Sequence, residues 1–175
     1  MIKPIVVYGS PILRQTCLPY NIGTDVSEIT EDLFDTMYNA KGAGLAATQI
    51  NQEFRIFVVD LPDLNWKKVF INPVISEYKG EDVVMNEGCL SIPKVSGPVK
   101  RKSEIVIEYY DEDWLFNKEE FDGIKARVIQ HEYDHLQGVL WVDKMEKMSA
   151  RDMLIIMTAL QHSKTKTSNP DYLII

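Results

Sequence analysis

The sequence has little cysteine, no excess of basic charge and no long apolar run. Its 175 residues include two cysteines and carry a formal net charge of -7. Two cysteines are too few for a disulfide framework, and an acidic chain without a basic stripe is a poor candidate for binding DNA. No apolar run approaches the roughly 20 residues that span a bilayer, and the first residues resemble neither a signal nor a transit peptide. We therefore expect a cytoplasmic protein that binds neither DNA nor membrane.

Apolar residues at helical spacing predict a first helix, and β-rich runs predict strands after it. The pattern Asp25-x-x-Glu28 is typical of a capping box, and Gly42 is expected to end this helix. Runs rich in β-branched and aromatic residues predict short strands. These expected strands cover 54–59, 69–72, 104–110 and 116–121, with a turn at 111–113 before the last.

Two further helices are expected in the second half of the chain. Asp122 can cap a helix over 123–137, and Gly138 supplies a stop signal. A third helix follows Ser149-x-x-Asp152 and should bury one apolar face. That face comprises Met153, Ile156, Met157 and Leu160. Strands grouped between helices favour an α+β fold with a largely antiparallel sheet. We expect 1–175 to form a single catalytic domain, with a C-terminal helix and tail after about residue 145.

The expected helix 123–137 carries His131 and His135, four residues apart, with Glu132 between them. At about 100° per residue the two histidines lie about 40° apart, on one face and one turn from each other. Glu132 is rotated about 100° from His131, so it can act beside a metal without ligating it. This His-Glu-x-x-His pattern supplies two metal ligands and a carboxylate that accepts a proton from water.

A catalytic metal needs a third protein ligand, and the sequence offers Cys89 upstream. Downstream of His135 the nearest suitable acid is Glu146, which is not at the spacing that zinc proteases use. Cys89 follows Gly88, where backbone can approach closely, and a metal deprotonates a coordinating thiol. The alternative, a buried apolar thiol, is the interpretation we give to Cys17. Three ligands leave a fourth position for water, as in catalytic sites.

Three segments, taken in order, resemble the signature motifs of the peptide deformylase family. They are 42–49 (GAGLAATQ), 87–91 (EGCLS) and 130–135 (QHEYDH). The resemblance implies a hydrolase that removes the formyl group from N-formylmethionyl peptides, on nascent chains near the ribosome. It also implies one divalent metal ion, Fe²⁺, which Zn²⁺, Ni²⁺ or Co²⁺ can replace. The bound metal itself is not determined by a donor set of this kind.

The same resemblance assigns roles to individual residues. Glu132 becomes the general acid and base, and the metal ligands are Cys89, His131 and His135. Gln49 and the backbone N–H of Leu90 are expected to stabilise the oxyanion, since an amide donor fits that role without adding charge. For Gln49 the alternative is a side chain that only caps nearby backbone.

A slot for the methionine side chain is expected beside the histidines. Ile124 and Val128 lie about two turns and one turn before His131, on its face, although both could also be ordinary core. Further candidates come from the resemblance alone, and they are Ala43, Gly44, Met85 and Arg127. Gly44 and Gly88 could expose backbone on which an extended peptide adds as a strand. Many relatives have a bulkier β-branched residue where Ala43 stands, so the slot rim is expected to be wider here. Many also have Arg where Ser96 stands, so no role for a cation is expected at that position.

Two other functions compete with this interpretation. A zinc peptidase could use the same His-Glu-x-x-His pattern, but it would leave Cys89 and Gln49 without a role. A non-catalytic peptide- or metal-binding module would be favoured by the loss of Glu132 or Gln49, and both are present.

Overall fold

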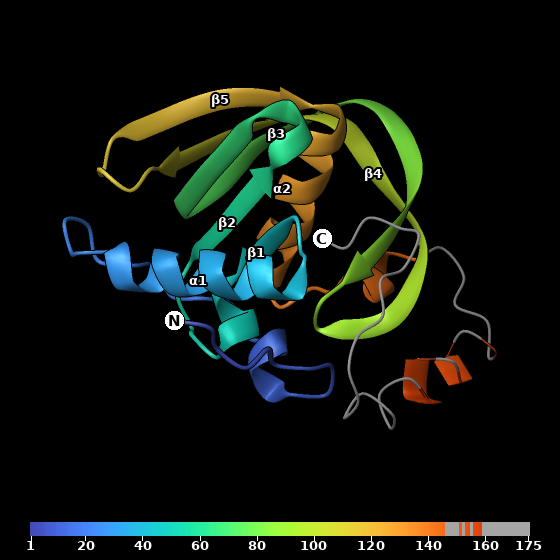
Figure 1. Ribbon diagram of the computed structural model, residues 1–175. Coiled ribbons are helices and arrows are strands. Elements are labelled where there is room, and N and C mark those ends of the chain that lie inside the picture. Colours follow the sequence, from blue (N-terminus) through green and yellow to red (C-terminus); the bar gives the residue numbers. More distant parts are fainter. Residues whose placement is uncertain (146–150, 152, 155, 159–175) are drawn as a thin grey trace.

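The computed structural model describes residues 1–145, 151, 153–154 and 156–158. Five strands form one antiparallel sheet in the order β1-β2-β3-β4-β5 (Figure 1). The strands are β1 (Gly44–Ala46), β2 (Ile56–Leu61), β3 (Trp66–Cys89), β4 (Ile92–Tyr110) and β5 (Phe116–Asp122). Two α-helices and four short 3-10 helices accompany the sheet up to residue 145. They are η1 (Pro11–Arg14), α1 (Ser27–Ala40), η2 (Ala47–Ile50), η3 (Pro62–Leu64), α2 (Gly123–Leu136) and η4 (Trp141–Lys144). The expected α+β class is confirmed.

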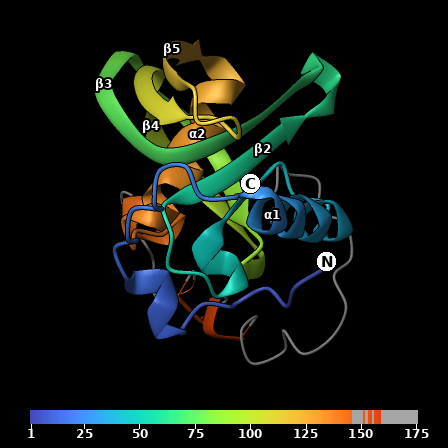
Figure 2. The ribbon, with the colours of Figure 1, turned by 90° about the vertical axis from the view of Figure 1, so that its left-hand side faces the viewer.

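The sheet curls around α2, and α1 lies against its other face (Figures 1 and 2). Successive side chains of a strand point to opposite faces. Phe57 and Val59 of β2 accordingly pack in the cluster that contains Val128 of α2. Val58, between them, packs in the cluster that contains Met37 of α1. The continuous apolar run of β2 is thus explained by helices on both faces of the strand.

Strands β3 and β4 are far longer than expected. The predicted strands 69–72 and 104–110 are only the outer parts of these two strands, which pair from Ile71–Tyr110 to Cys89–Ile92. The sequence between the two predicted strands indicates no further strand, because glycines, prolines and charges interrupt the apolar alternation. Four register shifts along the pair accommodate these residues. The long pair brings Cys89, at the end of β3, to the side of α2.

The helix boundaries correct two details of the prediction. Asp25 Oδ1 accepts the N–H of Ser27 at 2.9 Å, and no bond to Glu28 of the expected capping box is present among the described residues. Asp122 precedes α2 but makes no side-chain capping bond, so its predicted cap is wrong. Gly138 has φ +72° and donates its N–H to the carbonyl of His135, which confirms it as the stop signal.

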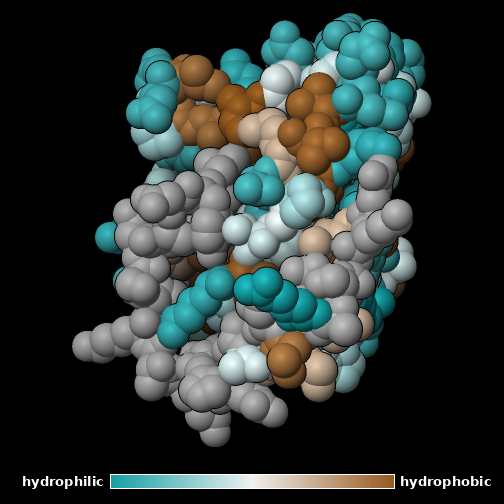
Figure 3. All heavy atoms as spheres, turned by 90° about the vertical axis from the view of Figure 1, so that its right-hand side faces the viewer, coloured by the Kyte–Doolittle hydropathy of each residue, from teal (hydrophilic) through white to brown (hydrophobic). Residues whose placement is uncertain are grey.

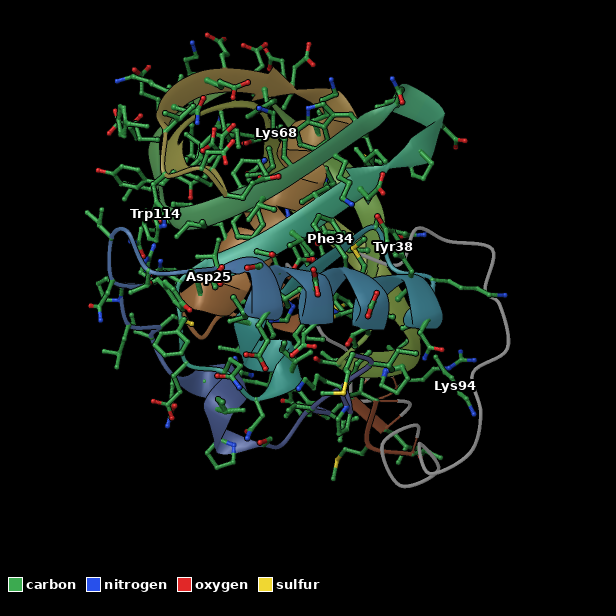
Figure 4. The ribbon with its side chains drawn as sticks, turned by 60° about the vertical axis from the view of Figure 1, so that its left-hand side comes forward. Asp25, Phe34, Tyr38, Lys68, Lys94 and Trp114 are labelled. Carbon is green, nitrogen blue, oxygen red and sulfur yellow. The ribbon has the colours of Figure 1, made fainter. Side chains whose placement is uncertain are left out.

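The turn between β4 and β5 contacts the loop before α1. Asp111 Oδ1 accepts the backbone N–H groups of Asp113 and Leu115, so the expected turn is confirmed. Trp114 then donates its indole N–H to the carbonyl of Thr24 at 2.9 Å. Figure 4 shows Trp114 near Asp25 at this end of the molecule. The contact joins two segments that are far apart in the sequence.

The C-terminal prediction is tested only in part. The described residues between 151 and 158 are helical, and Ile156 is buried. Met153 and Met157, expected on the same buried face, are exposed. Leu160 and the expected tail lie outside the described residues. Within the described part of the chain, no helix is both long and apolar enough to cross a membrane.

Candidate metal centre and active site

Cys89, His131 and His135 come together in the interior. One ligand atom from each lies within 4.8 Å of the others, and all three residues are buried. Cys89 Sγ is 3.3 Å from Nε2 of His135. The two imidazoles come from successive turns of α2 and the thiol from the end of β3, so two elements hold the three candidate ligands. This donor set is suited to one divalent transition metal.

Several polar atoms around these ligands are buried without a hydrogen-bond partner among the described residues. They are Nε2 of His131, Nδ1 of His135 and both carboxylate oxygens of Glu132. Leaving such groups unpaired costs free energy, and each one in a native structure requires an explanation. A cation bound to Nε2 of His131 would satisfy that atom, and a water beside the cation would give Glu132 a partner. The residues present therefore fit a metal.

The electrostatics of the centre also fit a cation. Burial raises the pKa of the Cys89 thiol to about 12, and the nearby Glu132 carboxylate adds to this rise. Burial likewise raises the pKa of Glu132 well above its ordinary value, and it lowers that of His135 well below. Without a cation the site therefore favours a neutral thiol, a neutral imidazole and a protonated carboxyl group. A divalent cation reverses the preference for Cys89 and Glu132, because it stabilises both anions.

Gln49, from η2, directs its side-chain amide at the same centre. Its Nε2 lies 3.5 Å from Cys89 Sγ and 3.2 Å from Oγ of Ser91. Its Oε1 accepts the backbone N–H of Ala46 at 2.8 Å, which fixes the orientation of the amide. Leu90 directly follows Cys89 in the turn between β3 and β4. The structure thus places the amide of Gln49 beside the candidate ligand Cys89, and Leu90 is the next residue along the chain.

Two glycines allow β1 to approach the site closely. A Cβ at Gly44 would lie 2.6 Å from Oε1 of Glu132, and a Cβ at Gly42 would lie 2.8 Å from Cδ1 of Leu90. Distances below 3.0 Å are essentially never seen for real Cβ atoms. The segment 42–49 therefore reaches both the carboxylate and the β3–β4 turn only because these residues lack a side chain.

A buried ion network behind His131 was not foreseen from the sequence. Glu87 accepts a hydrogen bond from Nδ1 of His131 at 2.9 Å, which leaves Nε2 of that histidine free for a metal. Arg101 binds both oxygens of Glu87, at 2.6 and 2.8 Å, and also Asp134. Burial raises the pKa of Glu87, but the hydrogen bonds from Arg101 and His131 outweigh it and hold the pKa well below its usual range. Only the position of Glu87, two residues before Cys89 on the same strand face, could have indicated this role.

The residues expected to form the methionine slot differ in burial and packing. Val128 and Ala43 are buried in one core cluster, and Ile124 packs against that cluster. Met85 is 38% exposed on β3. Figure 3 shows hydrophobic side chains gathered on the upper part of the face that contains β3 and β4. Exposed apolar residues of β3 include Val83, Val84 and Met85. Arg127 is buried, and its guanidinium donates to Glu87 and to two strand carbonyls.

The fold and the site together define a metal-dependent hydrolase: three convergent ligands and a buried carboxylate beside them. Comparison with known proteins identifies the family. The model of the family described as polypeptide deformylase matches residues 2–151. The peptide deformylase of Cytophaga hutchinsonii is 46% identical over 158 residues, which cover 86% of each chain.

Solved structures agree. A peptide deformylase from Legionella pneumophila superposes with a TM-score of 0.85 at 31% identity, covering 94% of this chain and 96% of that one. A class I type b peptide deformylase from Acinetobacter baumannii, bound to Met-Ala-Ser, gives 0.78 at 29% identity, covering 83% and 99%. The chain belongs to the polypeptide deformylase family, whose members are metal-dependent hydrolases that remove the N-formyl group from nascent peptides.

Proposed function

We propose that this chain deformylates N-formylmethionyl peptides, with Cys89, His131 and His135 holding one Fe²⁺ and Glu132 transferring the proton. The observation that carries the proposal is the buried Glu132 carboxylate, which has no partner among the described residues and lies beside three convergent ligand atoms. We further propose that the substrates are nascent chains near the ribosome, and that the protein acts in the cytoplasm without DNA or membrane.

The metal would supply Lewis acidity and lower the pKa of a water at the open position. Fe²⁺ follows from the family resemblance, and Zn²⁺, Ni²⁺ or Co²⁺ would fit the same ligands. Glu87 would keep His131 in the tautomer that presents Nε2. Glu132 would hold the proton taken from water and deliver it to the amine of the departing peptide.

Charge on the formyl oxygen is proposed to be stabilised by two protein donors. One is the amide of Gln49, whose orientation is fixed by Ala46. The other is the backbone N–H of Leu90, which belongs to the residue after the ligand Cys89. Both donors would be held in place before the substrate binds, so little reorganisation would oppose the reaction.

The peptide is proposed to lie extended along β1 and the end of β3. β1 pairs with β2 on one side, and its other edge has no strand partner within the described chain. Gly44 on β1 and Gly88 on β3 would offer backbone groups to an added strand. Its methionine side chain would enter the slot proposed beside α2. The slot residues are Ala43, Met85, Ile124, Arg127 and Val128.

The test is formate release by anaerobically purified protein, with metal content measured on the same sample. We expect formate from formyl-Met-Ala-Ser and no product from Met-Ala-Ser. Cleavage within the unformylated peptide would instead indicate a peptidase, and no product from either would indicate a binding module.

Glu132→Gln should retain the metal and lose activity by roughly 10²–10⁴-fold. The matched control is Glu31→Gln, a change on the exposed surface of α1 that should leave turnover unaltered.

A further inference from the structure

Arg127 makes a set of contacts that the proposed chemistry does not use. Its side chain is only 3% exposed. Nη1 donates to Oε1 of Glu87 at 2.9 Å and to the carbonyl of Val99 at 3.0 Å. Nη2 donates to the carbonyl of Val83 at 2.7 Å. One guanidinium from α2 therefore binds both long strands at once.

One of these carbonyls belongs to the residue paired with Met85 in the sheet, and the other lies two residues before Met85 on the same strand. Met85 pairs with Val99 across β3 and β4, and Val83 is two residues before Met85. On α2, Arg127 stands between Ile124 and His131 on the helix face that carries the proposed slot residues. The guanidinium therefore joins α2 to both long strands next to Met85, the residue expected on the strand side of the proposed slot.

Neutralising Glu87 does not depend on Arg127. Arg101 contacts both carboxylate oxygens of Glu87, and His131 contacts one of them. Without Arg127 the Glu87 carboxylate would keep these partners. The carbonyls of Val83 and Val99 would lose a buried, charge-assisted donor, which is among the stronger hydrogen bonds in proteins. Losing Arg127 should therefore change mainly the position of the two strands at the Met85–Val99 pair, and not the ionisation of Glu87.

We propose that Arg127 is a positioning residue that sets the width of the methionine slot and thereby its preference for an unbranched side chain. The inference rests on the proposed deformylase function. Arg127 acts through the Val83 and Val99 carbonyls and does not touch the reacting atoms. If the width of the slot is fixed, the slot accepts the methionine side chain and excludes the phenyl ring of phenylalanine. If the strand that carries Met85 can move away from α2, the slot admits both side chains.

The test compares formyl-Met-Ala-Ser with formyl-Phe-Ala-Ser in Arg127→Met and Arg127→Lys. Arg127→Met keeps the length of the side chain but removes every donor, and Arg127→Lys keeps the charge without the planar fork that reaches two carbonyls. In both variants the ratio of kcat/KM for the Met peptide over the Phe peptide should fall by about tenfold, mostly through KM for the Met peptide. Metal content and the absorption spectrum of the Co²⁺-substituted protein should stay unchanged.

The matched control is Arg55→Met. Arg55 also donates to a strand carbonyl, that of Pro73 at 2.7 Å, but it lies in the bend before β2 and is not one of the proposed slot residues. Arg55→Met should lower the melting temperature without changing the ratio of kcat/KM for the Met peptide over the Phe peptide.

An unchanged kcat/KM ratio in both Arg127 variants would overturn the inference. A ratio in Arg127→Lys equal to that of the unmodified protein would also overturn it. A fall in kcat with an altered Co²⁺ spectrum would also overturn it, since Arg127 would then act through Glu87. If the unmodified protein releases formate from neither peptide, the proposed function itself fails.

Discussion

The carboxylate of Glu132 lies against the α-carbon of Gly44, where a Cβ would fall 2.6 Å from Oε1 and 2.8 Å from Cγ. The two residues are far apart in the sequence and belong to different motifs. Because the chain can approach the carboxylate this closely only at a glycine, Gly44 restricts where Glu132 can lie.

Replacing Gly44 with alanine should displace the Glu132 carboxylate while leaving the metal in place. The three heavy atoms nearest to the added methyl group all belong to Glu132, so this side chain would have to move first. Misplacing a catalytic group by about 1 Å can cost roughly 100-fold, so we expect kcat to fall by about 10- to 100-fold. Formate release and metal analysis on one preparation check this. Full activity in Gly44→Ala would show that Glu132 tolerates displacement.

Gln49→Glu should separate the two hydrogen-bonding functions of Gln49. A glutamate keeps the oxygen that accepts the Ala46 N–H but removes the amide donor beside Cys89. Loss of one oxyanion donor typically lowers kcat by about 10²–10³-fold. We expect a loss of that size without loss of metal, and Ser91→Ala, which alters only the neighbouring hydroxyl, should retain most activity. Turnover equal to that of the unmodified chain would remove Gln49 from the reaction.

Glu87→Gln should weaken both metal binding and folding. Changing a group that orients a ligating histidine typically costs about 10- to 100-fold in metal affinity. Removing the charge from a buried ion pair costs about 3–5 kcal/mol of stability. Competition with a chelating dye and denaturant unfolding of the metal-free protein measure the two effects.

Asp134→Asn is the matched variant, because Asp134 binds Arg101 but not His131. It should destabilise the fold with a smaller effect on affinity, and equal losses of affinity in both variants would argue against orientation by Glu87.

Glu119 should make folding stability depend on pH. Burial raises the pKa of Glu119, but hydrogen bonds from Lys68 and Tyr109 outweigh it, so the pKa in the folded state is lowered. Lys68 Nζ lies 2.7 Å from Oε1 of Glu119 (Lys68 is labelled in Figure 4). A lowered pKa gives stability that is present above the unfolded value of about 4.3 and is lost as the pH falls through the folded value.

The measurement compares the chain with Glu119→Gln, both metal-free, by denaturant unfolding from neutral pH downward. The difference in free energy of unfolding should be constant near neutrality and should shrink below about pH 4.3. A difference that stays the same at every pH would show that Glu119 stabilises the fold without its charge.

The sequence alone determined those parts of the molecule that depend on local periodicity. Four-residue spacing places His131 and His135 on one helix face in any α-helix that contains them. Gly138 ends α2 because a left-handed residue is needed there, and glycine adopts that conformation without strain. Cys89 is predicted from the need for a third metal ligand, and the family resemblance supports it and supplies the role of Gln49. No local rule bridges the distance along the chain between these two residues and the histidines.

Only the tertiary structure decided how distant segments meet. β3 and β4 are long because they stay paired across several bulges. The sequence does not predict this pairing, because the alternation of apolar and polar residues is interrupted there. Arg101 and Glu87 are 14 residues apart, and Arg127 and Glu87 are 40 apart. Such buried charges are stable only where their partners converge, so their roles follow from three-dimensional proximity, which sequence spacing does not encode.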